Sequence, residues 1–234
     1  MIRFFRQLRK NLLMESKTSK YFKYAIGEIL LVVIGILIAL GINNWNEKLR
    51  EAKNERFLLQ KLQEENSINM QVLASDSVYR QRLPNTLSDF NGFLNHKKLE
   101  KHTDSLQHYL SEIMRSTSYT FTDNNLVNYI NLHKENTSGI NRELATLQNH
   151  QKDIQIISEK GVELKIDNFY QAIKKDVDFN NLTIHSYDHL GTLEFRNDVL
   201  ILLSVEDEIT LQFNRTLKQT RKVDSLITKR LMDD

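Results

Sequence analysis

Residues 24–42 read YAIGEILLVVIGILIALGI, and the rest of the chain is organised around this apolar stretch. Ile29–Ile42 carry neither a charge nor a polar side chain, and Glu28 is the only charged residue of the stretch. At a rise of about 1.5 Å per residue the stretch reaches roughly 28 Å, close to the ~30 Å hydrocarbon thickness of a bilayer. It therefore predicts a transmembrane helix over residues 24–42.

The charges on either side of this helix predict its orientation. Residues 1–23 hold seven basic side chains and one acidic side chain, whereas residues 43–234 hold 25 basic and 28 acidic ones. Because basic flanks stay on the cytoplasmic side, we expect a single-pass protein of the bacterial inner membrane with a cytoplasmic N-terminus and residues 43–234 in the periplasm. The mildly acidic charge of that larger part argues against nucleic acid as a partner.

Residues 1–23 are expected to contact the membrane surface. Within them IRFFRQLRKNLLM, residues 2–14, places apolar side chains at helical spacing among four cations. This pattern predicts an amphipathic cytoplasmic segment bound to anionic membrane lipids. A basic flank without defined structure is the alternative.

The apolar stretch has further possible roles. Ala39 and Gly41 fit a small-x-small signal cleavage pattern, but the long basic segment before the stretch and Trp45 after it favour a retained anchor.

Gly35 and Ala39 form a small-xxx-small pair of the kind that lets two membrane helices associate. Glu28 lies about one turn inside the boundary, where its carboxylate reaches the headgroups; a relay role is the alternative.

The segment YFKYAIGEILLVVIGILIALGINNWNE, preceded by IRFFRQLRKNLL, resembles the N-terminal signature of a family of uncharacterised single-pass membrane proteins from flavobacteria and their relatives, a domain of unknown function. The resemblance covers residues 1–47 and then fades into a general helical pattern. It implies a retained anchor followed by a helical extracytoplasmic domain. It implies no activity, and it assigns no functional residue.

The composition of the remaining chain favours helix. The whole chain contains one proline, seven glycines and no cysteine, so a disulfide framework, a thiolate zinc site and a cysteine nucleophile are excluded. From Trp45 to Val78 the pattern predicts a helical stalk that continues the membrane helix. Pro84 is expected to end it, and Thr86–Asp89 matches a capping box that opens the next helix.

The middle of the chain predicts shorter elements. Residues 116–125, STSYTFTDNN, predict a loop in which Thr122 or Asp123 is available to cap a helix over residues 126–133. Gly139 is expected to follow the end of that helix.

Two longer helices are predicted over residues 140–182 and 193–232, separated by a turn at 183–192. The last has the clearest apolar stripe outside the membrane. The stripe consists of Phe195, Val199, Leu202, Ile209, Phe213, Leu217, Val223, Ile227 and Leu231. The predicted fold is therefore all-α, with a transmembrane helix, a stalk and an extracytoplasmic bundle of long antiparallel helices over residues 43–234.

The sequence evidence for a metal site is weak. His185 and His189 have a spacing that metals use on helices, but no third ligand stands at a defined distance, so solvent-facing loop histidines are the simpler interpretation. Asp176 and Asp178 begin like a calcium loop, yet Asn181 occupies its glycine position and Tyr187 its glutamate position.

Catalytic motifs are not recognisable. There is no phosphate loop, dinucleotide fingerprint or Gly-x-Ser-x-Gly elbow. Glu206 and Asp224 fall in or beside the stripe of the last helix, where positions at a bundle end or edge explain them. We expect no enzyme activity, and we assign no catalytic, cofactor-binding or metal-binding residue.

The sequence favours a membrane-anchored structural or interaction protein of the envelope, with an unidentified protein partner or self-association. The alternative is a sensory helical module that relays a signal to a separate cytoplasmic partner, because residues 1–23 leave no room for an output domain. An enzyme would need a site assembled from residues far apart in the sequence.

Overall fold

The computed structural model describes residues 18–95, 98–134 and 139–233. These residues form an all-α fold, as the sequence predicts, with one small ladder of two-residue strands. The chain divides into two compact units, Met1–Arg56 and Phe57–Asp234, and helix α2 (Thr18–Phe93) contributes residues to both. The amphipathic helix predicted at residues 2–14 lies outside the described residues.

In the first unit, the described residues belong to α2. Every side chain from Ile29 to Ile42 is exposed, and the helix is long and apolar enough to cross a membrane. Trp45 and Leu49, two apolar residues at the start of the predicted stalk, are exposed as well.

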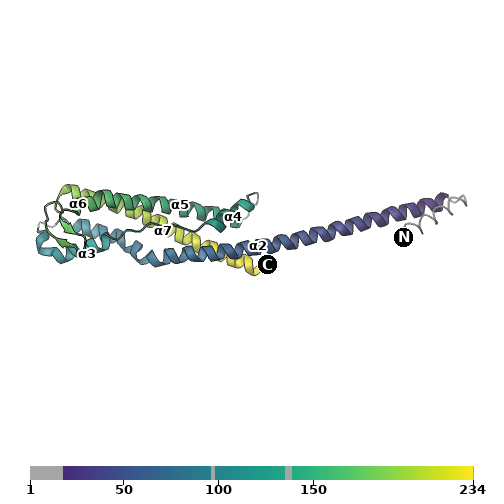
Figure 1. Cartoon of the computed structure of the whole chain (residues 1–234), viewed down its shortest axis with the longest axis horizontal. Helices are drawn as coiled ribbons and strands as arrows, with labels where there is room; N and C mark the ends of the chain where they lie inside the picture. Colours follow the sequence, from purple (N-terminus) through teal and green to yellow (C-terminus); the bar gives the residue numbers. More distant parts are fainter. Residues whose placement is uncertain (1–17, 96–97, 135–138, 234) are drawn as a thin grey trace. The chain divides into compact units, whose positions relative to one another are not determined.

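In the second unit, three long helices lie side by side (Figure 1). They are the part of α2 from residue 57, α5 (Gly139–Leu164) and α7 (Leu193–Asp233). Gln63 on α2 donates to Thr228, and Gln219 donates to Glu143 on α5. Within this unit each pair joins a residue near the start of one helix to a late residue of α7, so α7 is antiparallel to both α2 and α5, as predicted, whereas α2 and α5 run parallel to each other.

Shorter elements complete this unit. In chain order they are η1 (Leu99–His102), α3 (Thr103–Ile113), α4 (Asn124–Leu132), the π-helix η2 (Lys165–Tyr170), α6 (Gln171–Ile173), β1 (Val177–Asp178) and β2 (Thr183–Ile184).

The three long helices pack because their buried positions recur at alternating steps of three and four residues, which keeps one face toward the core. On α2 these positions are Leu59, Leu62, Asn66, Asn69, Leu73, Asp76, Arg80, Leu83, Leu87, Phe90 and Leu94 at its end. On α5 and into η2 they are Leu144, Leu147, Gln151, Ile154, Ser158, Gly161 and Lys165. The stripe predicted for the last helix is confirmed: all its members are buried except Leu231, which is partly buried.

The buried positions form three apolar clusters separated by two polar layers. The first cluster consists of Leu59, Leu62, Leu126, Tyr129, Leu144, Leu147, Val223 and Ile227. The second consists of Leu73, Tyr119, Ile154, Ile209, Phe213 and Leu217. The third includes Leu83, Phe90, Leu106, Phe169, Phe195, Val199 and Leu202.

The sequence predicts a helix end at Pro84, and this is wrong, because α2 continues to Phe93. Proline lacks the N–H that would bond the carbonyl of Arg80, four residues earlier. The hydroxyl of Thr210, on α7, lies 3.2 Å from that carbonyl oxygen and offers a donor in its place. The predicted capping box does not form, since Thr86 lies inside α2 and its hydroxyl donates to the carbonyl of Arg82.

Two other predicted boundaries are also wrong. Gly139 begins α5 and does not follow the end of a helix. The helix predicted to reach Leu182 ends at Ile173, and β1 and β2 then form an antiparallel ladder that pairs Val177 with Ile184 and Asp178 with Thr183. Two-residue strands are too short to show the alternation of apolar and polar residues that identifies a strand.

Candidate functional site

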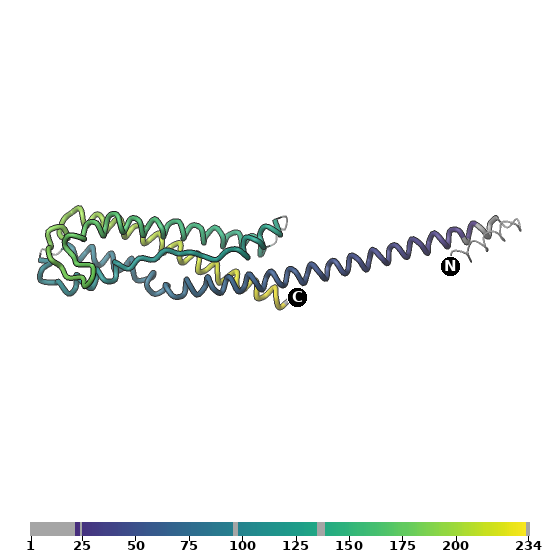
Figure 2. The backbone as a smooth tube through the Cα atoms, viewed as in Figure 1, coloured from purple at the N-terminus to yellow at the C-terminus, as the bar shows by residue number. Residues whose placement is uncertain are grey.

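Residues 114–123, here named the strap, form an extended segment between α3 and α4. The tube in Figure 2 shows the strap in teal, running along the bundle. Among the described residues, no backbone group from Arg115 to Thr122 pairs with another backbone group. Buried backbone groups need hydrogen-bond partners, so the side chains of neighbouring helices must supply them where water does not.

Polar side chains on the buried face of α2 supply several of these partners. Asn69 donates to the carbonyl of Thr122 at 2.7 Å and accepts from its N–H at 3.1 Å, so one amide satisfies both backbone groups. On α5, Ser158 accepts from the N–H of Tyr119 at 3.1 Å. The strap is therefore attached to both helices by side chains.

Glu65 on α2 caps the helix that follows the strap. Its carboxylate accepts the N–H of Asn125 at 2.8 Å and of Leu126 at 3.0 Å, at the N-terminus of α4, where a negative charge also complements the helix dipole. Asp123 holds the N-cap position, one of the two that the sequence predicts, but its side chain makes no capping bond.

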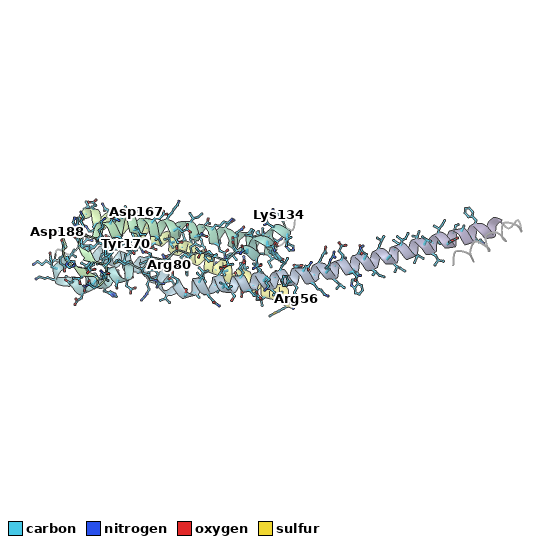
Figure 3. All side chains as sticks on the ribbon, viewed as in Figure 1. Arg56, Arg80, Lys134, Asp167, Tyr170 and Asp188 are labelled. Atoms are coloured by element: carbon cyan, nitrogen blue, oxygen red, sulfur yellow. The ribbon has the colours of Figure 1, made fainter. Side chains whose placement is uncertain are left out.

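At the middle of the strap lies a group of four buried charged side chains, here named the charged layer: Asp76, Arg80, Lys165 and Glu206. Arg80, labelled in Figure 3, is 1% exposed, and its guanidinium donates to Glu206 and to the hydroxyl of Thr117. Its Nε also donates to the Tyr119 hydroxyl at 2.9 Å. Because these partners lie on α7 and the strap, Arg80 joins three elements.

Glu206 and Lys165 extend the layer to the π-helix. Lys165 Nζ lies 3.1 Å from Glu206 Oε1 and donates to the carbonyl of Arg115 at 2.9 Å. Glu206 thus binds one cation with each carboxylate oxygen. Lys165 follows Gly161 by four residues, so it holds the next core position where α5 passes into η2.

Asp76 and two tyrosines complete the arrangement. Asp76 accepts hydrogen bonds from Arg115 and from the hydroxyl of Tyr119. The hydroxyl of Tyr79 donates to the carbonyl of Arg115 at 2.6 Å, and the guanidinium carbon of Arg115 lies 4.2 Å from the centre of the Tyr79 ring. The start of the strap is therefore held by its backbone as well as by a cation–π contact.

Burial and neighbouring charges shift the pKa values of this group. Burial lowers the pKa of Lys165, and Glu206 acts against that shift. Burial acts to lower the pKa of Arg80 too, but Glu206 and Tyr119 outweigh it, so the pKa of Arg80 is raised. Burial also raises the pKa of Tyr79 and of Tyr119.

The chemistry available to the charged layer is limited by these contacts. In their ordinary ionisation states its two cations and two anions balance, and Arg80, Lys165 and Glu206 are at most 2% exposed. A nucleophilic or acid–base role would require one of these hydrogen bonds to break. The layer is suited to holding α2, the strap, η2 and α7 in register.

The predicted metal candidates lie elsewhere. His189 Nδ1 is 3.0 and 3.1 Å from the two carboxylate oxygens of Asp176, while the backbone N–H of His185 donates to the carbonyl of Asp176 at 2.7 Å. Asp178 accepts from the N–H of Asn180 at 2.9 Å, which stabilises the turn between β1 and β2. Among the described residues, no group of three or more His, Asp or Glu side chains could hold a metal ion.

The two acids noted on the last helix have different environments. The prediction that Glu206 lies at a bundle end or edge is wrong, because it is buried between the second and third clusters. Asp224 is partly buried, and its Oδ1 lies 3.5 Å from Asn66 Nδ2.

Sequence reasoning missed Asp76, Arg80 and Lys165. The available signal is their spacing: Asp76 and Arg80 follow Leu73 by three and seven residues, and Lys165 follows Ser158 by seven. A charged residue at a core position of a seven-residue pattern indicates a buried partner.

Residues 28–143 match a family of unknown function, DUF6090. The matched range covers most of the apolar stretch, the strap and α4, and it ends before Lys165 and Glu206. No curated protein and no solved structure matches the chain.

Proposed function

We propose that the protein is a membrane-anchored interaction protein of the bacterial envelope, with residues 24–42 as a retained transmembrane helix. The observation that carries the proposal is the continuous exposure of the side chains from Ile29 to Ile42. Exposed apolar surface of this extent marks contact with lipid or with another protein, and the length of the stretch suits a bilayer.

The proposed orientation places residues 1–23 in the cytoplasm and residues 43–234 in the periplasm of the inner membrane. Fusing alkaline phosphatase to Asp234 should give active enzyme, and a fluorescent reporter that folds only in the cytoplasm should stay dark there. The reverse pattern would contradict the orientation. Finding Ile42 at the N-terminus of the purified protein would show cleavage after Gly41 and would contradict the anchor.

We infer that the charged layer is structural and that the chain is not an enzyme. Its side chains are engaged with one another and with the strap, which supports this role. The proposed partners are membrane lipids at residues 1–23 and a protein, or a second copy of the chain, at the bundle. We expect no nucleic acid partner.

Crosslinking in cells tests the protein partner. A photo-crosslinking residue at Ile68, which is apolar and exposed on α2, should capture a reproducible partner. The same residue at Gln60, exposed on the same helix, is the matched control. Capture of the same proteins in equal amounts at both positions would contradict partner binding at the surface around Ile68.

A sensory module is the second candidate, because α2 includes both the apolar stretch and the first core positions of the bundle. Such a module needs a cytoplasmic partner. Crosslinkers within residues 1–23 would capture that partner if the sensory proposal holds, and would label only lipid if it does not.

A further inference from the structure

The second polar layer, here named the amide layer, separates the first cluster from the second. It consists of Asn66, Gln151, Thr216 and Thr220, all buried, with one or two residues from each long helix. The hydroxyl of Thr216 lies 3.2 Å from the carbonyl of His150, and Asn66 Nδ2 donates to the carbonyl of Thr220 at 3.2 Å. These contacts place Asn66 and Gln151 within about one turn of each other along α7.

The amide layer leaves polar atoms unsatisfied. Within the described residues, neither Nε2 nor Oε1 of Gln151 has a hydrogen-bond partner, and the same holds for Asn66 Oδ1 and His150 Nδ1. Gln151 is only 4% exposed, so its amide is withdrawn from bulk water, and no protein group among the described residues takes the place of that water. Buried polar groups without partners destabilise the folded state in which they are buried.

The threonines of this layer bond mainly within their own helix. Thr216 and Thr220 each lie 2.8 Å from the carbonyl four residues earlier on α7. Such bonds do not join one helix to another. The charged layer differs, because its ion pairs and hydrogen bonds connect α2, the strap, η2 and α7.

We propose that the amide layer is a weak layer built into the bundle, at which the part containing the first cluster opens locally while the part held by the charged layer stays folded. Opening gives the amide of Gln151 access to water, which removes the destabilising burial. Regions of a fold that open separately in this way exchange their amide hydrogens faster than the rest.

Hydrogen exchange of the full chain in detergent micelles, followed by mass spectrometry, tests the proposal. Peptides covering residues 144–151 and 220–227 should exchange at least about tenfold faster than peptides covering residues 199–209. Gln151→Leu should slow exchange in the first two by about tenfold, because it removes both unsatisfied groups. Gln60→Leu, the same change at an exposed position, should leave them unchanged.

A second variant shows whether the opening is local. Val199→Ala removes buried methyl groups from the third cluster and should speed exchange over residues 199–209 by about tenfold. Exchange over 144–151 should stay within about twofold, because local opening leaves the third cluster folded. Equal acceleration of both regions would overturn the proposal, as would faster exchange in Gln151→Leu, which would mean that the amide has partners that leucine removes.

Discussion

Glu206 is a single residue on which the stability of the bundle is expected to depend. Its carboxylate is the shared anion of Arg80 and Lys165, and removing one partner from a buried ion pair costs about 3–5 kcal/mol. We expect Glu206→Ala to lower the free energy of unfolding of the full chain in detergent by about that amount. Denaturant unfolding followed by circular dichroism measures it.

The matched control is Glu208→Ala, two residues further along α7. Glu208 is exposed, and the hydrogen bond shown for it comes from Gln212 of the same helix at 2.9 Å. This variant should change stability by less than about 0.5 kcal/mol. Similar losses at the two positions would show that the buried carboxylate has no special role.

Gly161 illustrates a steric requirement at the same scale. A Cβ at this position would lie 2.6 Å from Ile209 Cδ1. Alanine favours helix over glycine by about 1 kcal/mol, but overpacking a core costs about 1–3 kcal/mol, and Ile209 is 1% exposed. We therefore expect Gly161→Ala to lower the melting temperature.

The Ile209→Val background tests that cause, because valine lacks the overlapping methyl group. There, Gly161→Ala should be neutral or stabilising relative to Ile209→Val alone. Destabilisation of the same size in both backgrounds would point to a cause other than this contact.

At the scale of the element, α2 combines a proline with an unbroken helix. The hydroxyl of Thr210 lies 3.2 Å from the Arg80 carbonyl that Pro84 leaves unpaired, and 2.8 Å from the carbonyl of Glu206. If the first contact compensates for the proline, Thr210→Val should cost about 0.5–1.5 kcal/mol in the natural chain.

A double-mutant cycle isolates this coupling. Pro84→Ala restores an N–H that can bond the Arg80 carbonyl within α2. Thr210→Val should then cost about 0.5 kcal/mol less than it does beside proline. A cost that is the same in both backgrounds would assign the hydroxyl to the carbonyl of Glu206 alone.

The elements differ in how well the sequence predicts them. α7 was predictable because most of its core positions are apolar, so its stripe and its start at Leu193 could be identified. The core face of α2 carries Asn66, Asp76 and Arg80 among its leucines, so apolar residues alone do not mark that face. Spacing alone indicates that such a polar residue has a buried partner, but only the fold identifies the partner.

At the scale of the whole molecule, composition and periodicity were enough to predict an all-α chain with one membrane-spanning candidate. The pairing within the charged layer was not predictable, because Arg80 and Glu206 are separated by 126 positions and belong to elements whose register only the fold defines. The strap illustrates the same limit. Its Ser- and Thr-rich sequence indicated a loop but not that helix side chains would satisfy its backbone.

Alkaline pH should weaken the second unit through its buried tyrosines. The pKa values of Tyr79 and Tyr119 are raised, so above the ordinary tyrosine value of about 10 the unfolded chain releases protons that the folded chain retains. Stability from these groups is complete below that pH and is lost as the pH rises further. Lys165, whose pKa is lowered, acts in the opposite sense and adds stability as the pH rises toward about 10.4.

Tyr79→Phe separates the tyrosine contribution from that of the lysine. This substitution removes a phenol whose hydroxyl donates to the Arg115 carbonyl, so it should destabilise the bundle at neutral pH by about 1 kcal/mol. It also removes one group that resists ionisation, so its melting temperature should fall less steeply than that of the natural chain between about pH 10 and 12. The melting temperatures of the variant and the natural chain should therefore converge as the pH rises. A difference in melting temperature that stays constant with pH would mean that Tyr79 ionises as readily in the folded bundle as in the unfolded chain.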